Sequence, residues 1–297
     1  MKRILIIIFT IFSTVVFAQS SGNNGLPFLK FGFGARNVAM GDAGSALAND
    51  ITSLFYNPSG LAGTEGSEAI FMHSEWIQDV RSEVGGIRSQ LFGLPVALGF
   101  NLTSIDGIEV RQKPGEAETT FDVTYFFGSL STGFFITDNI SFGTSVKYLY
   151  EGLYTEEATG FAFDFGLTYL SPIDGLKATA VYKNLGSMNE LRKESTKLPA
   201  ELRIGSAYSF DVDEFGLTAA AEFHKYTLED EVHINAGAEV KYKNLIALRA
   251  GYQSGYESRG FTGGIGLTWG RLNFDYAFVP FSLGFGSANL FSLGFRF

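Results

Sequence analysis

The sequence predicts an all-β protein, a transmembrane antiparallel up-and-down β-barrel of about fourteen strands with a short, partly helical N-terminal hatch in its lumen. Three observations predict this class. The chain begins like an exported protein, a long series of segments alternates apolar with small or polar residues, and the last segment is an alternating strand that ends in Phe297.

Residues 1–18 have the pattern of a cleavable export signal. Lys2 and Arg3 give a basic start, residues 4–16 are almost wholly apolar, and the small residue Ala18 follows as a cleavage site. The apolar run is too short for a stable membrane-spanning helix. We therefore expect export, and membrane crossing by strands.

Composition narrows the function classes. The 297 residues include 30 Phe, 13 Tyr and 36 Gly but no Cys, and the net charge is −9. The lack of Cys excludes a disulfide framework and a thiol nucleophile, and the negative charge argues against nucleic acid as a partner. No Pro/Ser-rich linker divides the chain after the N-terminal region. We expect a signal peptide at 1–18, a hatch at 19–66 and one barrel at 67–297.

The hatch is predicted where the alternation breaks down. Residues 33–50 are rich in Ala and Gly and have room for one or two short helical turns, and residues 57–60 form a turn. Such a stretch cannot cross lipid, because its backbone polar groups would be left unpaired. Its expected place is inside or beneath the barrel, where it would narrow the lumen.

The strands are predicted from period-two alternation, which places successive side chains on opposite faces. In residues 160–170, one face carries only aromatic residues and Leu, and the other carries Ala, Asp, Gly and Thr. The expected strands are 68–76, 83–91, 96–104, 119–131, 140–151, 159–170, 176–184, 200–210, 214–225, 231–242, 245–253, 260–269, 271–279 and 288–297.

The predicted connections alternate in length. Tight turns are expected at 92–95, 137–139, 171–175, 211–213, 243–244 and 270, and the longest loops at 105–118 and 185–199. Outer-membrane barrels have short periplasmic turns and longer outer loops. An even strand number then places both termini in the periplasm of a Gram-negative cell.

The C-terminal strand, residues 289–297, must pair with the first strand, because an open sheet edge is not tolerated in hydrocarbon. Its terminal Phe297 resembles the signal by which the bacterial barrel assembly machinery recognises its clients. That machinery and outer-membrane lipid are the expected partners. The alternative, a soluble β-sandwich or small barrel, is disfavoured because so many aromatic side chains would overfill its core or aggregate in water.

The predicted lumen face carries charges of both signs. These charges could line a permeation path, or they could pair with each other and with hatch residues such as Arg36, Asp42 and Asp50. The second interpretation is favoured, because an unpaired charge in a narrow lumen is costly. The charges are Lys147, Asp164, Arg203, Glu222, Glu239, Arg249, Arg271, Asp275 and Arg296.

The sequence offers little for catalysis. The histidines are His73, His224 and His233, and no serine lies in a G-x-S-x-G setting. We therefore expect no enzyme activity and no cofactor. His224 and His233 fall on the polar face of neighbouring strands, where they form either a metal-binding pair or, as we favour, two ordinary lumen residues.

The N-terminal motifs resemble those of a known family. The stretches Gly34-Ala35-Arg36, Ala39-Met40-Gly41-Asp42-Ala43-Gly44, Asp50 and Asn57-Pro58-Ser59-Gly60-Leu61-Ala62 are similar to the signature of the PorV/PorQ family, within the FadL-like superfamily of outer-membrane proteins. The resemblance implies a hatch built on Arg36, Met40, Gly41, Asp42, Asp50, Asn57 and Pro58.

The resemblance implies two different functions at the outer membrane. A PorV-like protein would bind secreted proteins through their C-terminal sorting domains and pass them on to a translocon in type IX-like secretion. A FadL-like protein would instead be a passive channel for hydrophobic small molecules. The sequence analysis places the PorV-like function first and the channel second. A structural or adhesive surface protein is a third class, for which the loops look too short.

Overall fold

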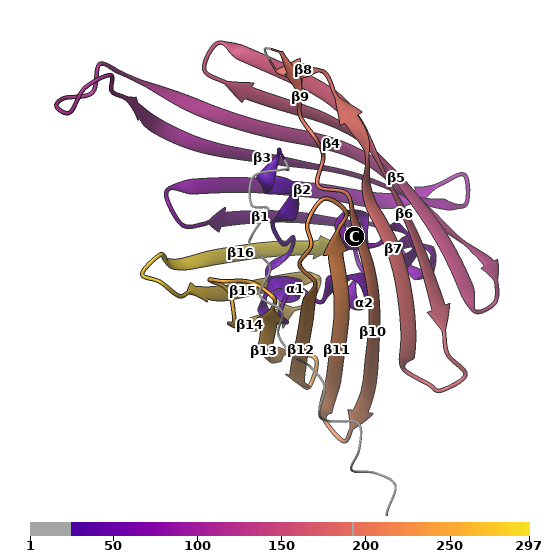
Figure 1. Cartoon of the computed structure of the whole chain (residues 1–297). Coiled ribbons are helices and arrows are strands. Elements are labelled where there is room, and N and C mark those ends of the chain that lie inside the picture. Colours follow the sequence, from indigo (N-terminus) through magenta and orange to yellow (C-terminus); the bar gives the residue numbers. More distant parts are fainter. Residues whose placement is uncertain (1–24, 192) are drawn as a thin grey trace, which may run out of the picture.

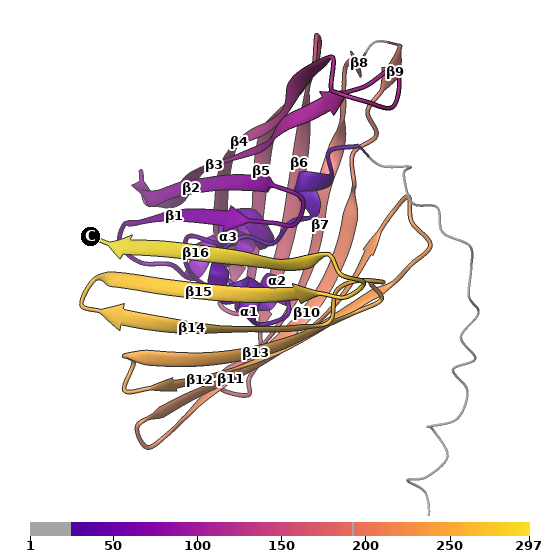
Figure 2. The ribbon, with the colours of Figure 1, turned by 90° about the vertical axis from the view of Figure 1, so that its left-hand side faces the viewer.

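The fold is a closed antiparallel barrel of fourteen strands, described here from a computed structural model that covers residues 25–191 and 193–297. Each barrel strand pairs with its neighbours along the chain, and β1 pairs with β16 to close the sheet (Figures 1 and 2). The predicted fold class is confirmed. The predicted signal peptide lies outside the described residues.

The barrel strands begin and end close to the predicted positions. They are β1 (Glu68–Glu75), β2 (Val80–Leu91), β3 (Leu94–Val110), β4 (Thr119–Thr137), β5 (Ile140–Leu153), β6 (Glu156–Leu170), β7 (Leu176–Met188), β10 (Glu201–Val212), β11 (Phe215–Tyr226), β12 (His233–Tyr242), β13 (Ile246–Ser254), β14 (Phe261–Trp269), β15 (Leu272–Phe281) and β16 (Gly286–Arg296).

Both predicted long loops contain more strand than expected. Strand β3 runs on past residue 104 to Val110, and its pairing with β4 shifts register between Ile105 and Ile108, so only residues 111–118 connect the two strands. The predicted loop at 185–199 includes the end of β7 and a small hairpin, β8 (Glu190–Leu191) with β9 (Glu194–Ser195). These extensions lack the aromatic face of a membrane strand, so apolar alternation could not reveal them.

The two ends of the barrel differ in their connections. One end, called the turn end, has short turns such as Phe92-Gly93 and Lys243-Asn244, whose positive φ angles suit tight hairpins. Residues 67 and 297 also lie there and are hydrogen-bonded to each other. The opposite end, called the loop end, carries the connections 76–79, 111–118, 154–155, 189–200, 227–232, 255–260 and 282–285.

The outer surface of the barrel is apolar. In β6, Phe161 is 56% exposed and Phe163 42% exposed, whereas their neighbours Ala162 and Asp164 are buried in the interior. The same alternation recurs around the wall, so large apolar side chains cover the outside. No helix in the described part of the chain is long and apolar enough to cross a bilayer.

The hatch lies inside the barrel, behind the wall strands in Figure 2. Its side chains are almost all buried, and they form the apolar core of the molecule together with inward residues of the wall. Its elements are η1 (Pro27–Lys30), α1 (Ala35–Ala39), α2 (Gly44–Leu47), α3 (Ser53–Tyr56) and η2 (Pro58–Gly63).

Glycines in the wall let the hatch backbone touch the barrel directly. Gly133, Gly143 and Gly166 lie side by side on β4, β5 and β6, and a Cβ at Gly143 would lie 2.2 Å from the carbonyl carbon of Pro58. Gly237 and Gly251 are paired on β12 and β13 and meet the backbone of Met40 and Gly41 in the same way. We call these two sets the glycine rows.

Candidate functional site

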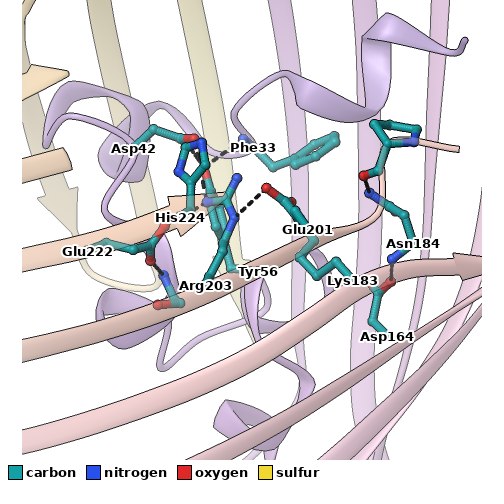
Figure 3. A network of polar contacts seen from close by, with 12 residues as sticks. Phe33, Asp42, Tyr56, Asp164, Lys183, Asn184, Glu201, Arg203, Glu222 and His224 are labelled. Carbon is teal, nitrogen blue, oxygen red and sulfur yellow. Dashed lines mark hydrogen bonds and ion pairs between the residues drawn. The ribbon is translucent and has the colours of Figure 1, made fainter. Parts of the chain in front are cut away.

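The lumen is the candidate functional site, because the hatch fills it and the buried charged residues of the wall converge there. The strongest polar network centres on Arg203 of β10 (Figure 3). Its guanidinium lies 2.9 Å from Glu222, 3.1 Å from Glu201 and 3.6 Å from Asp42 of the hatch. One wall cation therefore links two neighbouring strands to the hatch.

The hatch reinforces this network with its own hydrogen bonds. The Tyr56 hydroxyl donates to Asp42 and accepts from the Phe33 backbone N–H at 2.8 Å. The Ser45 N–H donates to Glu222 at 2.8 Å. Burial raises the pKa of Asp42, whereas Arg203 acts in the opposite direction. Burial and the nearby Asp42 carboxylate raise the pKa of Tyr56, so its hydroxyl keeps its proton and acts as the donor.

The network continues along the wall as a series of ion pairs. Lys183 lies 3.1 Å from Glu201, and Lys147 lies 2.6 Å from Asp164 and donates to Asn184 at 2.9 Å. These groups are buried, and each charge has an opposite partner. An ion or hydrophilic solute would have to displace these pairs, which is costly for buried charges.

A second network anchors the hatch nearer the turn end. Arg36 of α1 makes two hydrogen bonds to Glu239, at 2.9 and 3.0 Å, and Arg249 reaches the same carboxylate at 2.6 Å. Arg249 also pairs with Asp275 at 2.7 Å. Bidentate arginine–carboxylate pairs fix geometry as well as charge. The structure therefore brings together several of the wall charges that the alternation predicted.

The remaining hatch-motif residues act mainly within the hatch and at its glycine contacts. The Asp50 carboxylate accepts hydrogen bonds from the N–H and hydroxyl of Thr52 and makes no ion pair to a described wall residue. Asn57 caps η2 through Ser59 and donates to Thr168 of β6 at 3.0 Å. Pro58 is the first residue of η2. Met40 and Gly41 lie against the second glycine row.

One predicted lumen charge lies elsewhere. Arg271 is exposed in the turn between β14 and β15, because the strand begins one residue later than predicted. Arg296 is largely exposed at the turn end, where it borders a polar cavity beside the hatch and lies 3.4 Å from Glu68. Alternation also missed four buried members of the networks, although they share the inward face of their strands. They are Glu68, Arg88, Lys183 and Glu201.

A polar cavity of about 170 Å³ opens beside the hatch at the turn end. Arg36, Asp50 and Thr52 of the hatch face Lys241 and Asp275 of the wall across it. Charges of both signs line this cavity, so it offers no simple site for a single anion or cation.

A group of aromatic side chains around one arginine lies at the loop end, and we call it the mouth cluster: Phe31, Trp76, Tyr256, Arg259 and Phe281. Phe31 stacks on Trp76 with ring centroids 4.6 Å apart, and Trp76 meets Phe281 edge-on at 6.1 Å. The Arg259 guanidinium lies over the rings of Trp76, Tyr256 and Phe281 at 5.2–5.8 Å. The sequence alone does not predict this cluster, because its residues come from separate connections and strand ends.

The three histidines do not form a metal centre. His224 and His233 are direct cross-strand partners with ring centroids 4.8 Å apart, and Tyr256 contacts both rings. His73 lies apart from them, on β1, where it contacts Glu83 at 2.5 Å. Within residues 25–191 and 193–297, no group of three or more His, Asp or Glu side chains could hold a metal ion.

The fold and the filled lumen define a class: plugged β-barrels with an apolar outer wall. Comparison with solved structures finds the same architecture in CymD, a monoaromatic hydrocarbon channel, with a TM-score of 0.63 and 15% identity over 90% of this chain and 98% of that one. The Pseudomonas putida toluene transporter TodX matches with a TM-score of 0.61 and 16% identity over 89% and 96% of the two chains. At this identity the likeness shows the fold alone.

No family model matches the sequence, and no curated protein is significantly similar to it. The structural neighbours show a shared barrel fold, and the PorV/PorQ resemblance depends on the N-terminal motifs alone.

Proposed function

We propose that this protein is an outer-membrane channel for hydrophobic small molecules, closed at rest by its hatch. The observation that carries the proposal is a barrel with an apolar outer wall whose lumen is filled by an ion-paired hatch beneath an aromatic mouth. The structural likeness to CymD and TodX, which are described as a hydrocarbon channel and a toluene transporter, supports this proposal over the PorV-like one.

The proposed mechanism uses the two layers of the lumen differently. An apolar solute leaves water for the aromatic side chains at the loop end, because burying its surface is favourable. Displacement of part of the hatch then opens a route to the periplasm or to the lipid. Small inorganic ions and wholly hydrophilic solutes have no apolar surface to bury against the aromatic rings, and they meet the closed ion-pair network. In this proposal the loop end faces outward, and both termini lie in the periplasm.

Uptake by whole cells tests the channel, since the outer membrane of intact cells slows hydrocarbons. A host lacking its own hydrocarbon channel would express this protein, and the initial rate of labelled toluene uptake would be measured. We expect faster uptake than in the same host with an empty vector. An unchanged rate, with assembled barrel detected in the outer membrane, would contradict the proposal.

A PorV-like role in type IX-like secretion is the second candidate, and the signature around Asp42 and Asn57 favours it. These residues are buried in the hatch, however, so they explain a shared hatch better than cargo binding. Gene deletion in the native cell separates the two functions. Loss of many proteins with C-terminal sorting domains from the surface and medium would support the secretion role, and an intact secretome would exclude it.

A further inference from the structure

The mouth cluster contains a cation without an anionic partner. The Arg259 side chain is half-buried between the rings of Trp76, Tyr256 and Phe281. No ion pair joins it to a carboxylate in the part of the chain that the structure describes, whereas nearby Lys30 pairs with Glu229. A guanidinium stays charged at any physiological pH and presents its donors as a planar fork.

Two buried nitrogen groups beside Arg259 also lack partners. Among the residues that the structure describes, the indole N–H of Trp76, which is 8% exposed, has no acceptor, and neither ring nitrogen of His233, which is 5% exposed, has a hydrogen-bond partner. The guanidinium carbon lies 5.4 Å from the Trp76 ring, and Tyr256 connects it to His233 through a stacked contact of 4.0 Å. Buried polar groups without protein partners are rare, so these groups are available to hydrogen-bond a ligand.

From these observations we propose that the mouth cluster binds an aromatic carboxylate, with Arg259 as the group that takes the carboxylate. This inference rests on the proposed channel function and names a solute class for it, amphipathic aromatic anions. The fork of a guanidinium matches the two oxygens of a carboxylate. The Trp76 N–H supplies a further donor beside it.

The aromatic part of the solute follows from the surfaces around Arg259. The partly exposed Phe31 and Phe281 and the ring of Trp76 surround the guanidinium with aromatic side chains. A further ring packs against such side chains in offset or edge-on geometry. A plain hydrocarbon would pack against these side chains but leave the guanidinium and the indole N–H unpaired. Glu257, next to Tyr256, is exposed to solvent, where its charge is screened.

Tryptophan fluorescence gives a direct test. The chain has two tryptophans, Trp76 and the exposed Trp269 at the opposite end, so a Trp269→Phe background leaves one reporter within the site. The full-length protein in detergent micelles would be titrated with benzoate and, separately, with toluene. We expect a saturable change in Trp76 emission with benzoate, and a dissociation constant for benzoate about tenfold or more higher in Arg259→Gln.

Matched variants make the outcome decisive. Arg271→Gln removes an exposed arginine at the turn end and should leave benzoate binding unchanged. Arg259→Lys keeps the positive charge but loses the planar fork of donors, so its affinity for benzoate should lie between those of wild type and Arg259→Gln. It also serves as the test variant if Arg259→Gln does not assemble. Absence of saturable benzoate binding in wild type, or equal binding in wild type and Arg259 variants, would overturn the inference.

The toluene uptake assay keeps this inference separate from the channel proposal. Toluene uptake without benzoate binding leaves the channel standing and refutes the carboxylate site. Benzoate binding that depends on Arg259, in a protein that gives cells no toluene uptake, refutes the hydrocarbon channel and keeps the site.

Discussion

At the scale of single residues, the small size of the wall glycines is as important for placing the hatch as the charges of the ion pairs. At most positions of the glycine rows a side chain would meet main-chain atoms of the hatch, which cannot rotate away, and at Gly166 it would meet the Asn57 side chain. Alternation identifies such glycines as inward-facing, but it cannot show which of them meet the hatch, because that depends on how the two surfaces pack.

Gly143→Ala tests this contact. Its Cβ would lie 2.2 Å from the carbonyl carbon of Pro58 and 2.3 Å from the Ser59 nitrogen, so η2 must shift away from β5. We expect a loss of about 1–3 kcal/mol in unfolding free energy, the usual cost of overpacking. Denaturant unfolding of the refolded barrel in detergent measures it.

Gly128→Ala is the matched control for that experiment. Gly128 lies on the outer face of the adjacent strand β4, and a Cβ there would meet only the Phe126 ring, at 3.5 Å. Its unfolding free energy should stay close to that of wild type. Equal destabilisation by both substitutions would show that the hatch contact is not the cause.

Arg203→Met tests the central ion network. Glu201, Glu222 and Asp42 would lose their shared cation, and breaking a buried pair costs about 3–5 kcal/mol. The double variant Arg203→Met/Glu222→Gln should recover part of this loss, because one of the stranded carboxylates becomes neutral. A double-mutant cycle of unfolding free energies measures the coupling, and additive effects would contradict the proposed pairing.

At the scale of elements, the strands were predictable and the site was not. Alternation located every barrel strand, because one face of each must suit an apolar medium. It also marked Lys147, Asp164, Arg203, Glu222 and Glu239 as inward-facing. Their partners could not be predicted, since pairing depends on register and tilt between strands and on where the hatch lies.

Removal of the hatch tests its role as a plug. A variant lacking residues 26–63 would lose every helix that fills the lumen while keeping all the barrel strands. We expect wild type to conduct small ions poorly in planar bilayers and the deletion variant to show large, steady conductance. Equally low conductance in both, with correctly assembled barrels, would show that the hatch is not what closes the lumen.

At the scale of the whole molecule, the apolar outer wall decides where the protein resides. Ile265, at the centre of β14, is 56% exposed. Ile265→Arg should destabilise the protein folded in lipid vesicles by about 2–4 kcal/mol, the cost of a charge near the bilayer midplane.

Trp269→Arg, at the end of the same strand, should cost only about 0–1 kcal/mol, because the headgroup region accommodates charge. Equilibrium folding into vesicles of one lipid composition would compare the two variants. Equal costs at both positions would indicate that β14 does not span the bilayer.

The glycine rows also bear on how the molecule is made. They lie on nearly opposite sides of the cylinder, on β4–β6 and on β12–β13, and each is in contact with a different segment of the hatch. Contacts this close between wall and hatch leave little space for a folded N-terminal segment to enter a barrel that has already closed. We therefore expect the segment to enter the lumen before β1 and β16 join, so that the wall closes around it.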